Sequence, residues 1–440
     1  MDPEIEYILS LKAVRERAHK VLDLAEQGKL THFNYDREKL SVAADFVIGI
    51  IQRDFGPDKY HLIPPHGRWQ HFEVGGIPRI DQLLRQWDDQ NFDNVEKVRG
   101  LIDLFFVSVL LDAGAGDVWK FQEPGSEQTY NRSEGIAIAS LHMFLNGDFA
   151  TNGSSRKDVV EGAALQTLDA EKLYRGFQIN EESNPLLAVD KRVELLRRLG
   201  GSLLGLPEIF ANHGEIDMLI FEKNEDYLLS KAGNTNKIDY LNLWSVLQKL
   251  LIPIWPSDRT NVDGHPVGDA WPLTCLAKSS DPNTSTKISA IQSFHKLTQW
   301  LAYSLMVPFT RLLDVTWLNA DQGTGLAEYR NGGLFVDMGV LTLKDESLAE
   351  GLQRSSNADN GLPCFGASDD EIVEWRAMTV ALLDKLHDII KTSPQFNGVQ
   401  LTLPQVLEAG SWKAGRELAA EKRPLTKSSP IVILGDGTLF

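Results

Sequence analysis

The sequence predicts a mainly α protein, a large multi-helical globular fold with few short strands. Apolar residues recur at helical spacing in several long segments, whereas strands and helices do not alternate regularly along the chain. The patterns GxGxxG and GxxxxGK(S/T) do not occur, which disfavours a doubly wound nucleotide-binding fold. At 440 residues the chain is long for one domain. We expect residues 1–70 to form a helical segment that packs on residues 71–440, a single large catalytic domain.

Five segments carry the helical periodicity. Residues 132–145 present a wide face of Ala, Ile, Leu, Met and Phe side chains, and Asn146-Gly147 follows them as a usual helix end. Asp369 and Asp370 precede another periodic segment, where they supply the N-cap and the acidic first turn of a helix. The segments expected to be helical are 132–145, 192–206, 241–251, 291–306 and 371–391.

Signals for strands are few. Residues 334–340 and 431–434 are short apolar runs that can pair, and Gly435-Asp436-Gly437 follows the second. Clusters of Pro, Gly and polar residues predict loops between the periodic segments, at residues 55–78, 257–268, 278–286 and 355–368.

Charge and cysteine content limit which classes of binding partner and which cellular compartment we expect. Asp and Glu number 61 against 44 Lys and Arg, a net charge of −17, so the surface repels nucleic acid and anionic membranes on average. Only Cys275 and Cys364 are present and the acidic N-terminus lacks an apolar signal core, so we expect a cytoplasmic protein. We expect a small-molecule substrate, and no motif indicates a metal or a redox cofactor.

A glycine-rich run at residues 323–333 places a carboxylate, a phenol and a guanidinium side by side, at Glu328, Tyr329 and Arg330. Glycine lets a backbone turn sharply and approach a ligand closely, so acid and base groups here can meet a small polar substrate. Upstream, His295 and Lys296 add two titratable groups within a segment of helical periodicity. The alternative for that segment is a solvated helical face, which is the usual place of a lone lysine.

Two helix or turn boundaries carry acidic residues. Asp112 closes a very apolar run, where loss of solvent can raise the pKa of a carboxylate, although a capping or turn role is favoured on composition alone. Arg132 and Glu134 open the segment 132–145, where an acidic side chain complements the helix dipole. The same helix start can instead bind a phosphate or hydroxyl groups.

Two further motifs place polar residues in turns. His71 and Glu73 would point the same way on a strand, but a third ligand at fixed spacing does not follow, so a structural or substrate-binding role is favoured over a metal. Arg79 ends this motif. Asp269 lies close to Trp271, an arrangement that suits ligand recognition and an ordinary turn equally well.

These motifs lie within longer sequence segments in which the chain resembles the uracil catabolism protein 4 family, long catalogued as a domain of unknown function. From His71 onward the words are, in order, HFEVGGIPR, LLDAGAGDVW, RSEGIAIASLHMF, GFQIN, NPLLAVDKRVELLRRLG, VGDAW, FHKLTQWLAYSL, GLAEYRNGGLFVDMGVL, DEIVEWRAMTVALLDKL and DGTLF. The resemblance implies a role in uracil breakdown, in which uracil is made into a nucleotide and its ring is opened. Urea then remains attached to ribose or ribose phosphate.

A more distant resemblance, to the helical queuosine-salvage nucleosidases, implies a fold and a reaction class. That family carries an apolar run ending in Asp, a P-LL--RV-LL---G helix, an FLKRAQ helix and an ADYR turn. The matching parts of this sequence are Asp112 and residues 185–200, 294–299 and 327–330. Lys296 thereby corresponds to a pocket lysine, and Glu328 to a pocket carboxylate that is Asp in that family.

Together the resemblances imply an N-glycosyl hydrolase that releases urea from ribosylurea or its 5′-phosphate. Its transition state is oxocarbenium-like, so a carboxylate near the anomeric carbon, Glu328 first and Asp112 second, stabilises positive charge and activates water. Departing urea needs a proton, for which His295 and Lys296 are the candidates. The substrate-binding candidates, with the arginines for phosphate or sugar hydroxyls, are Arg330, Tyr329, Arg132, Glu134, Asp269, Trp271, His71 and Arg79.

Two other functions stay open from the sequence. A metal-dependent amide or ring hydrolase needs His71, Glu73, His142 and Asp269 to converge on a divalent ion. A non-catalytic scaffold binds another pathway enzyme and protects a labile intermediate, so other uracil-catabolism enzymes are candidate partners. The many titratable residues in glycine-rich turns favour an enzyme over a scaffold.

Overall fold

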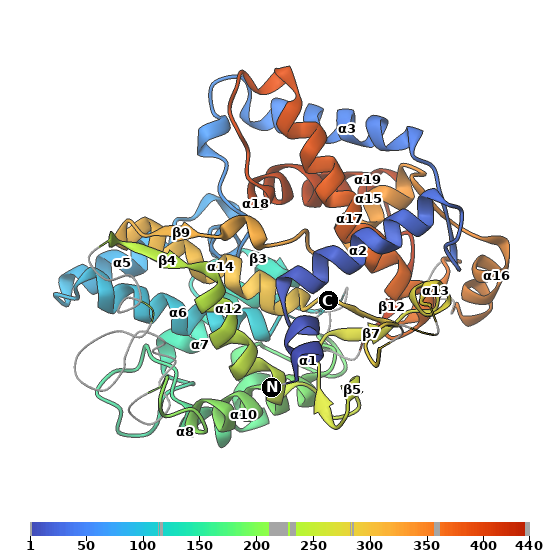
Figure 1. Cartoon of the computed structure of the whole chain (residues 1–440). Coiled ribbons are helices and arrows are strands. Elements are labelled where there is room, and N and C mark those ends of the chain that lie inside the picture. The colour runs from blue at the N-terminus through green and yellow to red at the C-terminus, as the bar shows by residue number, and fades with distance from the viewer. Residues whose placement is uncertain are drawn as a thin grey trace. The chain divides into compact units, whose positions relative to one another are not determined.

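The computed structural model describes residues 2–112, 114, 118–210, 228, 235–281, 283, 286–355 and 361–435. Within them the protein is mainly helical with short two-stranded sheets (Figure 1), which confirms the predicted fold class. The chain divides into two compact units that alternate along the sequence. Unit 1 comprises Met1–His66, Ser257–Lys296 and Asp321–Gly435; among the described residues, unit 2 comprises Gly67–Pro256 and Leu297–Ala320. The expected division near residue 70 stays a prediction.

Unit 1 is organised around α17 (Asp370–Thr392), which packs against α2 (Leu11–Glu26), α3 (Glu38–Phe55) and α15 (Tyr329–Asp337). Nearly every residue of the first four turns of α17 is buried, so this helix forms the core of the unit. The other described helices and turns of unit 1 are α1 (Pro3–Ile8), η1 (Tyr60–Leu62), α13 (Thr274–Ser279), α16 (Asp345–Arg354), η7 (Pro394–Phe396), α18 (Leu403–Val406), the π-helical η8 (Leu407–Ser411) and α19 (Trp412–Lys422).

Short sheets tie distant segments of unit 1 together. The antiparallel pairs are β1 (Phe33–Tyr35) with β10 (Leu341–Leu343), β5 (Asn261–Val262) with β6 (His265–Pro266), and β7 (Ala270–Pro272) with β8 (Ile291–Ser293). β11 (Cys364–Gly366) runs parallel to β12 (Val432–Leu434), which confirms the strand expected at residues 431–434. The pairing of Ala270 with Ser293 places the residues before β7 beside the start of α14 (Lys296–Leu313).

In unit 2, α6 (Asn94–Leu110) is buried along almost its whole length and packs against α7 (Arg132–Asn146) and α10 (Val189–Leu204). Asp93 and Glu96 form a capping box that fixes the start of α6. The remaining described elements are α4 (Trp69–Phe72), η2 (Val74–Gly76), α5 (Arg79–Asp89), β2 (Lys120–Gln122), β3 (Thr129–Asn131), α8 (Gly162–Gln166), α9 (Ala170–Gly176), β4 (Lys237–Asp239), α12 (Tyr240–Leu251), η4 (Ile252–Ile254), α14 from Leu297 onward, β9 (Thr316–Leu318) and η5 (Ala320–Gln322), which runs on into unit 1.

Four of the five expected helices are confirmed, as α7, α10, α12 and α17, and α7 ends at a left-handed Gly147 as predicted. The expected helix at residues 291–306 begins later, because residues 291–293 form β8 and α14 starts at Lys296. The predicted loops at 278–286 and 355–368 fall partly outside the described residues, and the residues after Gly435 fall wholly outside them.

The strand expected at residues 334–340 is wrong, because residues Tyr329–Asp337 form α15. The carboxylate of Glu328 accepts hydrogen bonds from the amides of Arg330 and Asn331 and thereby caps a helix. Leu334 and Phe335 are buried on that helix. A short apolar run does not distinguish a strand from a buried helical segment by its periodicity.

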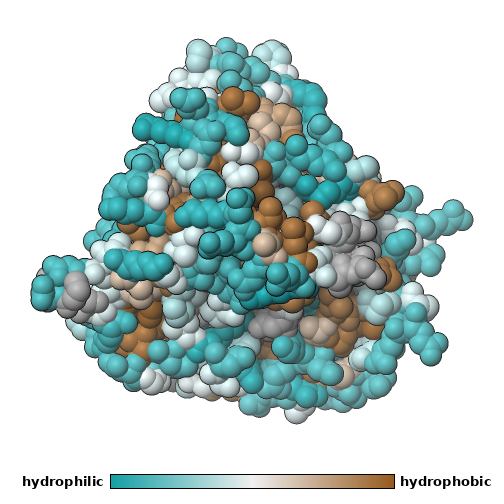
Figure 2. All heavy atoms as spheres, turned by 90° about the vertical axis from the view of Figure 1, so that its right-hand side faces the viewer, coloured by the Kyte–Doolittle hydropathy of each residue, from teal (hydrophilic) through white to brown (hydrophobic). Residues whose placement is uncertain are grey.

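The surface agrees with the acidic, polar composition. On the face drawn in Figure 2, hydrophilic side chains cover most of the area and apolar ones are scattered between them. Among the helices of the described residues, none combines the length and the apolar character needed to cross a membrane.

Gly415 of α19 permits a close helix contact in unit 1, because a Cβ atom there would overlap the backbone carbonyl of Arg330. The Gly415→Ala variant is expected to lower the free energy of unfolding by about 1–3 kcal/mol, since backbone atoms must shift. Gly49→Ala is the matched control, because Gly49 lies on exposed α3 surface with no atom near its missing Cβ. That control is expected to be neutral or up to about 1 kcal/mol more stable. Denaturant unfolding measures both, and equal stability of the two variants would contradict this prediction.

Candidate active site

Glu328 lies at the N-terminus of α15 and is almost fully buried, with 8% of its surface exposed. Its Oε2 atom accepts a hydrogen bond from the amide of Arg330 at 2.8 Å, and its Oε1 atom accepts one from the amide of Asn331. A carboxylate oxygen accepts two hydrogen bonds, so capping the helix leaves acceptor capacity on both oxygens.

The electrostatic surroundings of Glu328 include Lys296. Burial raises the pKa of Glu328 above its ordinary value. The hydrogen bonds from the amides of Arg330 and Asn331 and the positive charge of Lys296 only partly oppose that rise. Lys296 is itself buried, and its positive charge acts on the Glu328 carboxylate. Unit 1 thus brings together two residues that stand 32 positions apart in the sequence.

Asp269 fixes the backbone that leads to Lys296. Its Oδ2 atom accepts a hydrogen bond from the Lys296 amide at 3.0 Å, and its Oδ1 atom accepts one from the indole of Trp271 at 2.8 Å. Both oxygens also accept hydrogen bonds from Arg376 of α17, each at 2.8 Å. Burial alone would raise the pKa of Asp269, but Arg376 and the other donors hold it far below its usual range. Asp269 therefore stays ionised, and both of its carboxylate oxygens already accept hydrogen bonds from the protein.

His295 has a structural contact in unit 1. Its Nε2 atom lies 3.0 Å from the carbonyl oxygen of Ile8, to which it donates in the neutral ring. Burial lowers the pKa of His295, which is 1% exposed. A buried neutral imidazole with that bond is poorly suited to protonate a leaving group, so Lys296 is the better candidate of the two.

Arg330 and Tyr329 lie on the first turn of α15. The guanidinium of Arg330 donates to the carbonyl oxygen of Lys427 at 2.9 Å and lies over the Tyr329 ring, 4.9 Å from its centroid. Arg330 is buried, whereas Tyr329 is half-buried. The expected substrate-binding roles of both residues stay predictions.

Asp112 belongs to unit 2, where it forms an ion pair with the fully buried Arg68. The Nη1 atom of Arg68 lies 2.6 Å from Asp112 Oδ2, and the hydroxyl of Ser133 donates to Oδ1 at 3.1 Å. The same guanidinium donates to the hydroxyl and the carbonyl oxygen of Ser108. Asp112 is thus the counter-charge of a buried arginine within its unit.

The other candidates in unit 2 have varied surroundings. Arg132 and Glu134 are half-buried on the first turn of α7, and the charge of Glu134 acts on Arg68. His71 is buried against Trp300, with ring centroids 5.8 Å apart in an edge-to-face arrangement.

The guanidinium of Arg79 is committed to internal bonds. It forms a two-pronged ion pair with Glu123, at 2.7 and 2.6 Å. It also donates to the carbonyl oxygens of Phe72 and Val74 and to the hydroxyl of Tyr130. This saturation favours a structural role for Arg79 over the predicted binding of phosphate or sugar.

The residues of the metal-dependent alternative are divided between the units, with Asp269 in unit 1 and His71, Glu73 and His142 in unit 2. Glu73 accepts a hydrogen bond from the indole of Trp69 at 2.9 Å, and His142 lies 3.7 Å from Glu123. Across the described ranges, no group of three His, Cys, Asp or Glu side chains is arranged to hold a metal ion.

Comparison with known proteins adds the family. The family model described as "Protein of unknown function (DUF1688)" matches residues 7–440. The chain belongs to the DUF1688 family. It is 48% identical over 437 residues to "Protein urg3" of Schizosaccharomyces pombe, with 98% of each chain covered. It is 42% identical over 451 residues to "Uracil catabolism protein 4" of Lachancea kluyveri, with 100% of each chain covered. The first predicted resemblance is thereby confirmed, and the one to queuosine-salvage nucleosidases stays a prediction.

In this member of the DUF1688 family, a π-helical turn supports the backbone at Glu328, and the sequence did not predict it. The hydroxyl of Ser411, the last residue of η8, donates to Asn331 Oδ1 at 2.8 Å. The side-chain Nδ2 of Asn331 in turn donates to the carbonyl oxygen of Leu326 at 3.1 Å. Isolated π-helical turns are frequent at functional sites. A π turn leaves no periodic signal in a single sequence, so only the structure reveals this support.

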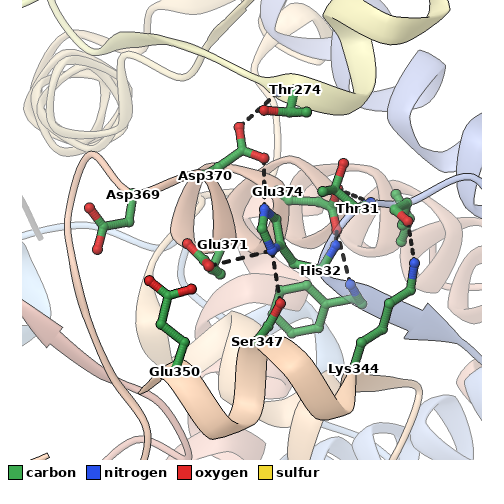
Figure 3. Close-up of polar contacts among 12 residues, drawn as sticks. Thr31, His32, Thr274, Lys344, Ser347, Glu350, Asp369, Asp370, Glu371 and Glu374 are labelled. Carbon is green, nitrogen blue, oxygen red and sulfur yellow. Dashed lines mark hydrogen bonds and ion pairs between the residues drawn. The ribbon is translucent and has the colours of Figure 1, made fainter. Parts of the chain in front are cut away.

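A second polar cluster of unit 1 surrounds His32, which precedes β1 (Figure 3). Its Nε2 atom lies 2.8 Å from Asp370 Oδ2, and its Nδ1 atom lies 2.9 Å from Ser347 Oγ and 3.4 Å from Glu371 Oε1. Figure 3 shows these side chains converging on the imidazole from α16 and from the first turn of α17. A protonated ring donates from both nitrogens, which is the form that two neighbouring carboxylates favour.

Glu374, one turn further along α17, holds the backbone beneath this ring. Its carboxylate accepts hydrogen bonds from the amides of Thr31 and His32, each at 2.7 Å, and of Phe33 at 3.0 Å. Burial raises the pKa of Glu374, and these amide donors oppose the rise. The start of β1 is therefore fixed to α17 by one carboxylate.

The cluster predicts a pH-dependent stability. Burial opposes a charge on His32, but the bond to Asp370 and the surrounding carboxylates outweigh burial and raise the pKa of His32. The pKa of Asp370 is lowered, chiefly by His32 and the Thr274 amide, against the effect of burial. The stabilisation by His32 is thus complete below its unfolded pKa of about 6.5 and is lost as the pH rises through the higher folded value.

Thermal unfolding from pH 6 to pH 9 measures this effect. The difference in melting temperature between the native protein and His32→Gln is expected to shrink as the pH rises. The exposed His61 supplies the control, since His61→Gln is expected to follow the native curve at every pH. A His32→Gln difference that stays constant across the range would show that protonation of His32 adds nothing.

Proposed function

We propose that this protein is a hydrolase of uracil catabolism that cleaves the N-glycosidic bond of ribosylurea or its 5′-phosphate. The products are urea and ribose or ribose phosphate. The relative of Lachancea kluyveri, which the chain covers in full, is named a uracil catabolism protein. The observation that carries the reaction class is the buried Glu328 carboxylate at the start of α15, on which the positive charge of the buried Lys296 acts.

In the proposed reaction, a water oxygen bonds to the anomeric carbon as the bond from that carbon to the urea nitrogen breaks. Glu328 stabilises the positive charge that develops on the sugar and takes a proton from the attacking water. Lys296 gives a proton to the departing nitrogen, so that neutral urea leaves. Water is consumed and no oxidant or reductant is needed.

The surroundings of Glu328 suit this role. A general base works best when its pKa approaches the working pH, and burial moves the pKa of Glu328 in that direction. The positive charge of Lys296 opposes this rise, because it favours the carboxylate form. The hydrogen bonds from the two backbone amides of the helix cap hold the carboxylate in one orientation.

The test is an assay of the purified protein with ribosylurea and with its 5′-phosphate, in which free urea and free reducing sugar are both measured. Equal molar release of urea and sugar from at least one compound is the expected result. Release of ammonia without sugar would indicate an amide hydrolase instead, and no urea from either compound would remove the proposal. Repeating the assay after exhaustive chelation measures any dependence on an exchangeable metal ion.

A further inference from the structure

Asp269 accepts hydrogen bonds from three consecutive backbone amides in unit 1. Its carbonyl oxygen accepts hydrogen bonds from the amides of Phe294 at 2.8 Å and His295 at 3.2 Å, and its side chain accepts one from Lys296 at 3.0 Å. The pairing of β7 with β8 brings these segments side by side. One residue therefore sets the path of the chain into Lys296.

That path includes a conformation that needs support. His295 has a φ of 46°, in the left-handed region that residues other than glycine adopt uncommonly. Such a backbone persists where its surroundings over-determine it. The bonds from both neighbouring amides to Asp269, together with the contact of the His295 ring to Ile8, supply that support.

Arg376 connects this backbone to the segment before Glu328. Its guanidinium forms a two-pronged bond to Asp269 and lies 3.9 Å from the centroid of the Phe294 ring. Its Nε atom also donates to the carbonyl oxygen of Ala327 at 3.4 Å. Ala327 immediately precedes Glu328, so one rigid, planar group touches the residue before Glu328 and, at Asp269 and Phe294, the backbone arrangement that leads to Lys296.

The pair is enclosed, since the side chains of Arg376 and Asp269 are 3% and 6% exposed. Each oxygen of Asp269 accepts at least two hydrogen bonds from the protein. A buried pair of this kind is weak evidence for stability, but such pairs can specify one geometry among several. Its position indicates a role in alignment and not in proton transfer.

We infer that Arg376 and Asp269 are positioning residues, which hold Lys296 and Glu328 at a fixed separation without touching the substrate. The inference rests on the proposed function, because it assigns to the pair the alignment of the two groups that act on the glycosidic bond. A loss of alignment by about 1 Å can lower a rate about 100-fold.

The test variant is Arg376→Lys, which keeps the positive charge but cannot form a two-pronged bond with a carboxylate. The expected result is a fall in kcat of about 10–100-fold with little change in KM, because the pair does not bind the substrate. The matched control is Arg354→Lys, since Arg354 pairs with Asp369 and Glu350 on the surface of the same unit. The control is expected to keep native kcat and KM. A rise in KM with unchanged kcat in Arg376→Lys would overturn the inference by showing substrate binding.

A second measurement needs no catalysis. The rate of amine acetylation at Lys296, followed by peptide mass spectrometry, is expected to rise in Arg376→Lys and to stay native in Arg354→Lys. Lys97 of unit 2, which is as buried as Lys296 at 8% exposed, serves as the internal reference. Faster labelling at Lys296 alone supports local positioning, whereas no change at Lys296, or a parallel rise at Lys97, overturns it. If the native protein released no urea, the proposed function would fail while this labelling still tested the role of the pair.

Discussion

Replacing Glu328 with Gln is expected to lower kcat for urea release by about 100- to 10,000-fold, because the amide neither stabilises a cationic sugar nor accepts a proton from water. The side-chain oxygen of Gln can still accept one of the two backbone-amide hydrogen bonds that cap α15. The variant is therefore expected to fold, with a loss of about 0.5–2 kcal/mol in unfolding free energy. Steady-state kinetics with ribosylurea or its phosphate measure the first effect, and denaturant unfolding measures the second.

Glu328→Asp is the matched control for that variant. It keeps both the carboxylate and a good N-cap. Its kcat is expected to lie between those of the native protein and Glu328→Gln. Native rates in Glu328→Gln would show that this carboxylate only caps a helix, and the proposed chemistry at Glu328 would then be wrong.

Replacing Arg68 with Met is expected to lower the free energy of unfolding by about 3–5 kcal/mol, because the buried Asp112 would lose its ion-pair partner, although the charge of Arg192 also acts on it. The hydroxyl and the carbonyl oxygen of Ser108 would also lose their guanidinium donor. The midpoint of denaturant unfolding, followed by tryptophan fluorescence, measures this loss.

Two further variants isolate the charge of Asp112 as the cause. Arg68→Met combined with Asp112→Asn is expected to recover part of the lost stability, since the buried carboxylate that lost its ion-pair partner is then removed. Arg198→Met removes a surface pair with Glu194 on α10 and a hydrogen bond to the carbonyl oxygen of Trp255 in the same unit, and it is expected to cost about 1 kcal/mol or less. Equal losses in the single and double variants at position 68 would instead assign the effect to packing.

The sequence was sufficient to predict the helices whose apolar face is long. The periodic segment 371–391 corresponds to α17 (Asp370–Thr392), because a helix of that length repeats its buried face several times. The run at residues 334–340 failed because it is too short to show a period, and the decisive contact was the cap at Glu328. Asp369 occupies the N-cap position of α17 as expected, but its carboxylate bonds to Arg354 and to the amide of Gly366.

The candidate site could be predicted only in part. The roles of Glu328 and Lys296 came from resemblance to short sequence segments, and within unit 1 the positive charge of Lys296 acts on Glu328. Arg376 was missed because its partner Asp269 is 107 residues away and no local pattern joins them. The available signal was the presence of Glu374 and Arg376 inside an otherwise apolar helix, since buried charges are rare unless paired.

The discontinuous make-up of unit 1 has a consequence for the newly made chain on the ribosome. Asp384 of α17 accepts a hydrogen bond from Arg15, 369 positions earlier, and contacts His19. Since translation adds roughly 5–20 residues per second, the first helices wait roughly 20–70 s for their permanent partner. During that time their apolar faces lack α17. We expect the nascent N-terminal segment to be a substrate for chaperones, and unit 1 to complete its folding only after α17 has left the ribosomal tunnel.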